Sequence, residues 1–389
     1  MIPKGEGKWL LRWFTGRDSS GKRKYASRLF SGTTSQARKK LNSLTTQVAE
    51  GTFVAPAKQT VGQYLEWWLE NVCKPSVRPF TLRSYEQRLR IDIYAAVGAL
   101  KLHKLTWQTL QTVYNRLREA RKSGRTIGYT HTVLKSALGH AVKGKLLREN
   151  PCDHAVPGAH VKKEMVVWTA DEVQLFLERT KGTRDYPLWY TLLHTGLRPG
   201  EAFGLRWGDL QRNRLHIQRA VAQQGKAYTY NIESPKTERS KRSVVLTKEN
   251  IEVLQTHRRA QAAAMLAAGP EYKRLDFVFA GADGSFDNDM YARRRWKRSV
   301  ARVNGLLRRE YGKDRRVEDA PQLARIRMYD TRHTHATLLL KANVHPKVVS
   351  ERLGHANIKI TLDTYSHVLP DMQKEAVAQL EALMAASGK

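Results

Sequence analysis

Cysteine is scarce in this chain of 389 residues, which carries only Cys73 and Cys152. Two cysteines cannot build a disulfide framework, and these two do not have metal-ligand spacing. Long hydrophobic runs are missing too: the most apolar stretch, AAAMLAAG, is far too short to cross a bilayer. The opening segment MIPKGEGKWLLRWF is too polar for a signal peptide. These absences favour a reducing, cytoplasmic setting and no membrane partner.

Acidic residues are few, with 36 Asp and Glu against 68 Lys and Arg, which gives a formal charge of +32. Such a charge opposes a compact state by self-repulsion unless a polyanion neutralises it. The basic residues are spread along the whole chain instead of forming one amphipathic segment, so an anionic membrane is the weaker candidate. We therefore expect a protein that binds DNA or RNA.

The length and the local patterns predict a multidomain protein that is mainly α-helical with small β-sheets. Residues 1–55 form the first predicted domain, in which two basic strands are joined by a turn and followed by a helix. Ser35 is the expected cap of that helix and Gly51 its expected end. A small basic sheet backed by one helix can lie in a DNA groove, although such charges are also often only solvated.

Residues 59–150 predict a helical domain of four helices, three of them capped by Thr60, Thr81 and Thr106. The opposite helix faces carry a basic set that suits a DNA clamp or is simply solvated: Arg83, Arg88, Arg90, Arg116, Arg118, Arg121 and Lys122. The stretch NPCDHAVPGAH, residues 150–160, breaks the helical pattern and predicts an interdomain linker.

Residues 163–389 form the third predicted domain. A capping box from Thr169 to Glu172 opens its first helix. Short strands are expected at RLHIQ, KAYTYNIE and RSVVLT, and helices again from about Tyr291. The last helix is amphipathic and is expected to complete the core; its apolar residues are Val377, Leu380, Leu383 and Met384.

Four short stretches of this third domain hold polar residues that a helical core does not need. In HTGLRPGEAFGLRW, Pro199 suits a first helical turn, so Arg198 lies at a helix N-terminus, a natural anion site. Glu201 lies one turn on and can hold the guanidinium. By itself this pattern is equally typical of an ordinary surface ion pair.

The other three stretches are as ambiguous when each is taken alone. ESPKTERSKRSVVL puts Lys236 in a tight turn near strands, where most basic turns are solvated. MYDTRHTHATLLLKANV puts Arg332 at the start of a buried helix, where it needs an anionic partner such as Asp330 or a phosphate. ERLGHANIKITLDTYSHVLP separates His355 and Tyr365 by ten positions.

Together, and in this order, the four stretches resemble the tyrosine recombinase family, the phage-type integrases and their relatives in mobile elements. The resemblance covers nearly the whole chain. It implies an arm-type DNA-binding domain, a SAM-like core-binding domain and a catalytic domain. It also implies a site-specific recombinase that integrates or excises a mobile element through a covalent 3′-phosphotyrosine, without cofactor or metal. The implied partners are core-type and arm-type sites on double-stranded DNA, three further copies of the chain in a homotetramer, and a host DNA-bending factor. The resemblance also implies that the amphipathic last helix docks on a neighbouring protomer.

The resemblance also implies a role for each residue of the site. By the resemblance, Tyr365 is the nucleophile, and Arg198 and Arg332 grip the scissile phosphate. Lys236 protonates the leaving oxygen and His355 hydrogen-bonds the phosphate. Glu201 is the acid that braces Arg198.

One position departs from the family pattern. A histidine usually stands three residues before the second arginine, where this chain has Tyr329. A phenol with a pKa near 10 can donate a hydrogen bond but is a poor base at pH 7. His333 or His335 could compensate, although neither occupies the motif position, so the proton acceptor stays open.

Two alternative functions also stay open at this point. A type IB topoisomerase would use the same chemistry to relax one duplex, but it would not need the separate basic N-terminal sheet. A non-catalytic DNA-binding protein on the same scaffold would tolerate the tyrosine at position 329, but it would not need the reactive residue types at the other positions.

Overall fold

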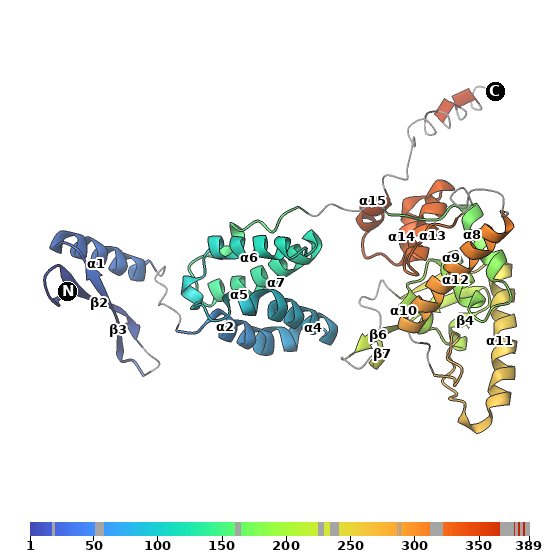
Figure 1. Ribbon diagram of the computed structural model, residues 1–389, viewed down its shortest axis with the longest axis horizontal. Coiled ribbons are helices and arrows are strands. Elements are labelled where there is room, and N and C mark those ends of the chain that lie inside the picture. The colour runs from blue at the N-terminus through green and yellow to red at the C-terminus, as the bar shows by residue number, and fades with distance from the viewer. Residues whose placement is uncertain are drawn as a thin grey trace. The chain divides into compact units, whose positions relative to one another are not determined.

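The computed structural model describes residues 1–17, 20–50, 58–159, 165–224, 229–233, 241–285, 287, 289–311 and 322–365, and positions 377, 380, 381, 384 and 385. The chain divides into two compact units, Met1–Lys163 and Glu164–Lys389, which are described separately (Figure 1). None of the described helices is both long enough and apolar enough to cross a membrane.

The first unit opens with an antiparallel sheet of order β1–β2–β3, followed by one helix; the elements are β1 (Ile2–Pro3), β2 (Lys8–Arg17), β3 (Arg23–Ser31) and α1 (Thr34–Ala49). Leu11 and Trp13 of β2 pack against Ala37 and Leu44 of α1. The two predicted strands and the helix are confirmed, and β1 adds a short edge.

Thr33, and not the expected Ser35, caps α1. Its hydroxyl accepts from the backbone N–H of Gln36 at 3.3 Å, and the Gln36 side chain accepts from the Thr33 N–H at 2.9 Å. This reciprocal box needs a Gln or Glu three positions on, which Thr33 has, whereas Ser35 is followed there by Arg38. Gly51, the expected end, lies outside the described residues.

The helical block of the first unit contains α2 (Val61–Trp68), α3 (Lys74–Ser76), α4 (Pro79–Arg88), α5 (Ala95–Val97), α6 (Trp107–Glu119) and α7 (Gly124–Lys143). The π-helical turns Leu69–Cys73 and Leu89–Tyr94 join α2 to α3 and α4 to α5, so the block has the four predicted helical rods. Thr60 and Thr106 are caps as predicted. Thr81 is not, because Pro79 starts its helix two residues earlier.

The stretch predicted as an interdomain linker is partly packed onto this block. The Asn150 side chain donates to Lys135 O at 2.9 Å and accepts from the N–H of Cys152 at 3.1 Å. Cys152 is 1% exposed. Gln111 accepts from the N–H of Val156 at 2.9 Å. Residues 150–156 therefore pack onto the helical block, which the Pro and Gly composition could not indicate.

The predicted basic set of this block is not uniform. Arg88 lies 3.6 Å from Asp92, whose side chain is buried and also accepts from Thr130 at 2.6 Å. The charge of Arg88 therefore offsets that of Asp92 inside the block. The five members that are exposed are Arg90, Arg116, Arg118, Arg121 and Lys122.

The second unit contains the helices α8 (Ala170–Thr180), α9 (Tyr186–Thr195), α10 (Pro199–Phe203), α11 (Lys248–Ala268), α12 (Asp289–Glu310), α13 (Asp330–Lys341), α14 (Pro346–Leu353) and α15 (Ile358–Tyr365). Its strands are β4 (Leu210–Gln211), β5 (Arg214–Ile217) and β8 (Arg242–Val245) in one antiparallel sheet, and β6 (Ala220–Gln224) and β7 (Thr229–Glu233) in another. The capping box from Thr169 to Glu172 and the three predicted strands are confirmed.

Helix α11 was not predicted. It follows the strands at once, whereas we expected helices to return only near Tyr291. Its buried residues are Asn250 and Leu254 alone, so the chain shows too short an apolar stripe there to indicate a helix by its period. At the C-terminus, the exposed Val377, Leu380 and Met384 are helical, and Leu383 lies outside the described residues.

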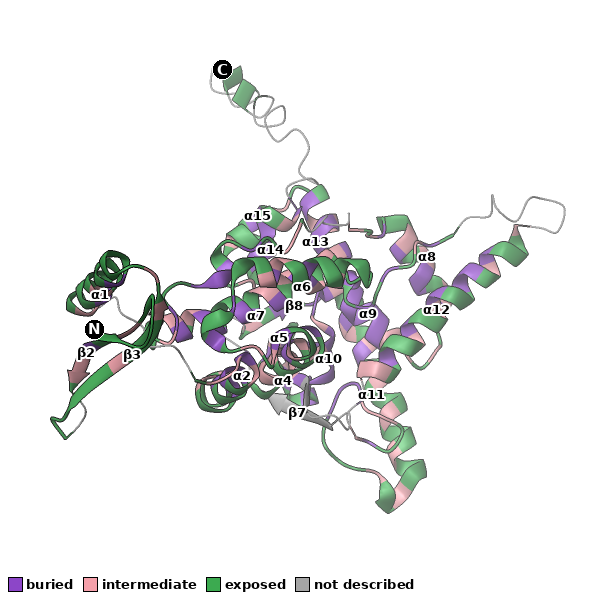
Figure 2. Ribbon diagram, turned by 60° about the vertical axis from the view of Figure 1, so that its left-hand side comes forward, coloured by how far each residue is buried: buried purple, intermediate pink, exposed green. Residues whose placement is uncertain are grey.

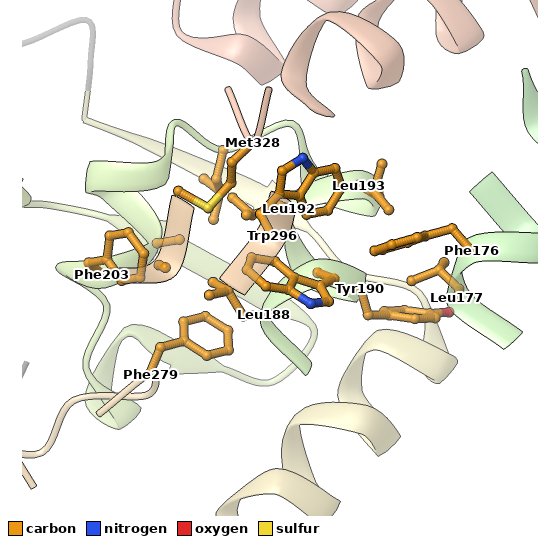
Figure 3. Packing of buried hydrophobic residues seen from close by; sticks show 14 of the residues in the cluster. Phe176, Leu177, Leu188, Tyr190, Leu192, Leu193, Phe203, Phe279, Trp296 and Met328 are labelled. Carbon is orange, nitrogen blue, oxygen red and sulfur yellow. The ribbon is translucent and has the colours of Figure 1, made fainter. Parts of the chain in front are cut away.

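A tryptophan cluster forms the centre of the second unit. The Trp168 and Trp296 rings stack with centroids 5.4 Å apart, and the Trp189 ring meets Trp296 edge-on at 5.1 Å. Figure 3 shows Trp296 among the aliphatic and aromatic side chains around it. Both Trp168 and Trp296 donate their indole N–H to backbone carbonyls, of Ala324 at 2.8 Å and Ile326 at 2.9 Å. The cluster thereby joins α8, α9 and α12 to the segment that leads into α13.

A second, smaller core lies between α13, α14 and α15, which Figures 1 and 2 both show side by side. Its buried members are Ala336, Leu340, Val349, Leu353 and Tyr365. The last of these is the candidate nucleophile, so the packing that closes this core also holds the phenol.

We expect Trp296→Ala to lower the free energy of unfolding of the second unit by about 3–5 kcal/mol, because it leaves a large cavity. Leu266→Ala, at a side chain that is 78% exposed, should change it by less than about 0.5 kcal/mol. Urea denaturation followed by circular dichroism measures both. Equal midpoints for the two variants would contradict the central place of Trp296 in the core.

Candidate active site

Arg332 is the buried centre of the candidate site. This side chain on the first turn of α13 is 1% exposed. Its Nη1 donates to Gly196 O at 2.9 Å and its Nη2 to Leu353 O at 2.7 Å. Gly196 ends α9 and Leu353 is the last residue of α14, so the guanidinium lies where two helix dipoles present their negative ends. One cation thus holds three segments of the chain together.

The two glycines of the sequence motifs are required by this arrangement. Gly196 and Gly354 end α9 and α14 in the left-handed region, with φ of +65° and +68°. A Cβ on Gly196 would lie 2.6 Å from the His335 ring, and one on Gly354 would lie 2.9 Å from the Arg242 side chain. Gly196 in HTGLR and Gly354 in ERLGH are therefore structural. Without side chains of their own, they allow His335 and Arg242 to come close to the backbone.

Glu201 joins two arginines in a buried clamp. It is 5% exposed. Its Oε1 accepts from Arg198 Nη1 at 2.8 Å and its Oε2 from the Arg198 backbone N–H at 2.9 Å. Arg242 donates to the same two oxygens at 3.1 and 2.9 Å. Burial alone would raise the pKa of Glu201, but the hydrogen bonds and charge of Arg242 and the charges of Arg198 and Arg332 lower it to about 2.

Arg242 is a site residue that we did not single out from the sequence. Its side chain is 6% exposed, and its Nε also donates to Arg352 O at 2.7 Å. It lies in the strand segment RSVV, two positions before the buried Val244. Because side chains alternate between the two faces of a strand, Arg242 faces inward like Val244. An inward-facing arginine requires a buried acid, and that signal could have identified it.

The candidate nucleophile lies beside a histidine. The Tyr365 hydroxyl is 2.8 Å from His333 Nδ1, and the tyrosine is 1% exposed. Burial raises the pKa of Tyr365 to about 12, although the charge of Arg332 opposes this. The phenol is therefore close enough to the buried arginine for that charge to act on it, and it stays protonated at neutral pH.

His355 lies close enough to the same arginines for their charges to act on it. Its Nδ1 is 2.7 Å from the hydroxyl of the fully buried Thr361. Burial and then the charges of Arg332, Arg198 and Arg242 lower the pKa of His355 to about 4. The ring is neutral at pH 7, so one ring nitrogen can donate a hydrogen bond while the other accepts one.

The remaining predicted residues fall into three cases. Tyr329 is 43% exposed, and its ring meets that of His333 at 5.5 Å between centroids. His335 is buried, with Nδ1 3.0 Å from Leu193 O and Nε2 accepting from Arg352 at 3.0 Å. Lys236 lies outside the described residues. Among the predicted site residues, the structure thus brings together Arg198, Arg332, Glu201, His355 and Tyr365.

Comparison with known proteins supplies the family. Residues 167–372 match the Phage integrase family, and residues 60–118 match the phage integrase N-terminal SAM-like domain. The chain is 30% identical to a XerC-like tyrosine recombinase of Caldanaerobacter subterraneus subsp. tengcongensis, over 95% of this chain and 94% of that protein. The chain belongs to the phage integrase family. It is a tyrosine recombinase. The prediction of an enzyme for site-specific recombination of mobile elements is therefore confirmed.

The chain is also similar to further proteins from mobile elements and phages. The transposase from transposon Tn916 of Enterococcus faecalis is 26% identical over 97% of this chain and 89% of that protein. A Tn1549 transposon integrase, solved in complex with transposon right end DNA, has a TM-score of 0.69 at 22% identity, over 84% of this chain and 100% of that one. A lambda integrase dimer bound to a COC' core site has a TM-score of 0.55 at 13% identity, over 81% and 96%. These structures confirm the predicted fold class.

We expect Arg242→Met to destabilise the second unit by about 3–5 kcal/mol, because it leaves the Glu201 carboxylate buried with one cation fewer. Adding Glu201→Gln should recover part of this loss, since the buried charge is then removed. Arg259→Met, on the exposed side of α11, is the matched control and should be neutral. If the double variant is no more stable than Arg242→Met alone, the clamp is not the cause.

The low pKa of Glu201 also predicts a pH dependence. A carboxyl with a depressed pKa stabilises the fold above its unfolded value near 4.5 and loses this contribution as pH falls towards about 2. The native chain should therefore lose up to about 3 kcal/mol of stability relative to Glu201→Gln across this interval. Unfolding midpoints at pH 6, 4 and 3 measure the difference. A constant difference would contradict the ionised clamp.

Proposed function

We propose that this recombinase cleaves one DNA strand by attack of Tyr365 on the scissile phosphate. The Tyr365 oxygen forms a bond to phosphorus, the bond to the 5′-oxygen breaks, and a 3′-phosphotyrosine and a 5′-hydroxyl result. The covalent link keeps the energy of the broken bond. A 5′-hydroxyl of a second duplex then reverses the step, which joins the strands without ATP and integrates or excises the element.

The observation that carries this proposal is the convergence of three arginine charges around Glu201. The guanidinium groups of Arg198, Arg242 and Arg332 all act on Glu201, which offsets only one of their three positive charges. A phosphate that gains negative charge during attack is the complementary ligand. Arg198, 35% exposed, and Arg332 provide bidentate donors for its non-bridging oxygens. Tyr365 is within reach of the Arg332 charge.

The other residues of the motif complete the reaction. In the tautomer whose Nδ1 accepts from the Thr361 hydroxyl, His355 would donate a hydrogen bond from its other nitrogen to a phosphate oxygen. Lys236 would protonate the leaving 5′-oxygen as the general acid. Glu201 would hold Arg198 in place. Tyr329 stands at the position of the usual histidine, and its phenol is a weak base.

DNA binding would use all three proposed domains, residues 1–55, 59–150 and 163–389. The outer face of the N-terminal sheet carries the exposed Phe14 and Tyr25, with the Arg12 guanidinium 4.6 Å from the centre of the Tyr25 ring. This face suits an arm-type site, and the exposed basic residues of the helical block suit a core-type site. Four copies would act on two duplexes in the cytoplasm, with a host bending factor as an optional partner.

We expect the native chain to form a covalent adduct on a nicked suicide duplex that carries the repeat from the ends of its element. Tyr365→Phe should abolish the adduct, and Tyr291→Phe, at an exposed tyrosine, should not. Arg198→Ala should lower the cleavage rate by about 100- to 1000-fold, because one donor to the transition state is lost. Gel electrophoresis of the protein–DNA adduct measures all four.

Three outcomes would contradict this proposal. An adduct with Tyr365→Phe would show that another residue is the nucleophile. Relaxation of a plasmid without the site, with no strand exchange, would favour a topoisomerase. Specific binding without any adduct from the native chain would favour a non-catalytic DNA-binding protein.

A further inference from the structure

The proton acceptor for Tyr365 is the one role that the motif leaves without a suitable side chain. A buried phenol with a pKa of about 12 is ionised in only about one molecule in 10⁵ at pH 7. Attack on phosphorus by the un-ionised hydroxyl is slow, so a base within hydrogen-bond reach is needed.

Three nearby groups are poorly suited to this role. Tyr329 is a phenol and more exposed than Tyr365 itself. His335 has both ring nitrogens engaged, by Leu193 O and by Arg352. His355 has its Nδ1 at the Thr361 hydroxyl and a pKa lowered to about 4, which makes it a weak base.

His333 has the geometry that the role requires. Its Nδ1 is 2.8 Å from the Tyr365 hydroxyl, within the range of a direct proton transfer. It follows Arg332 on the first turn of α13, so the rigid helix that carries the phosphate-binding arginine also carries this ring. The Tyr329 ring packs edge-on against it. Tyr329, at the position where the family usually has a histidine, thus packs against the His333 ring and limits its orientation.

The surroundings keep His333 neutral before the reaction. Burial lowers its pKa, the carboxylate of Asp330 opposes this, and the charges of Arg332 and Arg327 lower it further. The groups that face it from other elements are Tyr365 at the end of α15 and His355 after α14. With Nε2 protonated, Nδ1 presents a lone pair to the phenol.

We propose that His333 is the general base of the cleavage step, an inference that rests on the proposed role of Tyr365 as the nucleophile. The Tyr365 proton moves to His333 Nδ1 while the phenol oxygen bonds to phosphorus and the bond to the 5′-oxygen breaks. The 5′-oxygen takes its proton from the general acid. On rejoining, the His333 imidazolium returns its proton to the phenol oxygen as the phosphotyrosine bond breaks.

His333→Asn tests the transfer itself. The Asn Oδ1 takes roughly the place of Nδ1 and accepts a hydrogen bond from the phenol, but it cannot take the proton. His345→Asn, the same change at an exposed histidine that caps α14, is the matched control. Both variants are compared with the native chain on the nicked suicide duplex, under single-turnover conditions from pH 6.5 to 9.5, with DNA affinity measured separately.

At pH 7 we expect His333→Asn to slow adduct formation by about 100-fold or more, with DNA affinity within twofold of native. The native rate should be nearly flat above neutral pH. The His333→Asn rate should rise about tenfold per pH unit, because hydroxide then ionises the phenol. His345→Asn should match the native chain. Should His333→Asn fail to fold, His333→Ala with added imidazole replaces it, and imidazole should restore cleavage.

Two results would overturn this proposal alone: cleavage by His333→Asn within threefold of native at pH 7, or a loss that stays constant as pH rises, which indicates a positioning role. An adduct with Tyr365→Phe, or none with the native chain, would overturn the proposed function and this proposal with it. A measurement without DNA tests the contact between His333 and Tyr365 independently of the proposed function. The carbon-13 Cζ resonance of Tyr365, identified by its absence in Tyr365→Phe, should shift in His333→Ala; an unchanged resonance contradicts the contact.

Discussion

The whole site depends on the burial of one cation, Arg332. Its guanidinium donates to two backbone carbonyls that end separate helices, so it serves as a brace between α9, α13 and α14. Carbonyl groups orient and solvate a cation but do not neutralise it. In the proposed function, this uncompensated charge attracts the scissile phosphodiester. The interaction that holds the second unit together at this point therefore also prepares it for its substrate.

The clamp around Glu201 extends this constraint to the strands. Arg242 at the start of β8 reaches both Glu201 of α10 and the carbonyl of Arg352 in α14. Gly354 lies against the same arginine, which leaves no space for a side chain. Polar contacts thus hold together the sheet, α10 with its capping residue Arg198, and the segment that carries His355, whereas the tryptophan cluster stabilises the centre of the unit.

Packing and reactivity also meet in Tyr365. The ring belongs to the small core of α13, α14 and α15, and this burial raises the pKa of the phenol. As the proposed nucleophile, a phenol kept protonated and out of solvent is protected from unwanted reactions, but it depends on a neighbour to remove its proton. His333 meets that need from the helix that also carries Arg332. The tyrosine at position 329 then belongs to the packing of this pair, although its motif position suggested a chemical role.

The sequence alone determined the features that depend on neighbours along the chain: the pairing of Arg198 with Glu201 one turn on, the caps at Thr60, Thr106 and Thr169, and the ordered motifs that identify the family. It misplaced Ser35 and Thr81 as caps, since small shifts in a helix start are set by Gln36 and Pro79. Only the tertiary structure decided the partners of Arg242, the packing of residues 150–156 and the contact of His333 with Tyr365, 32 positions away. Those contacts join segments distant in the chain, and burial, which has no local signature, fixes which charges meet.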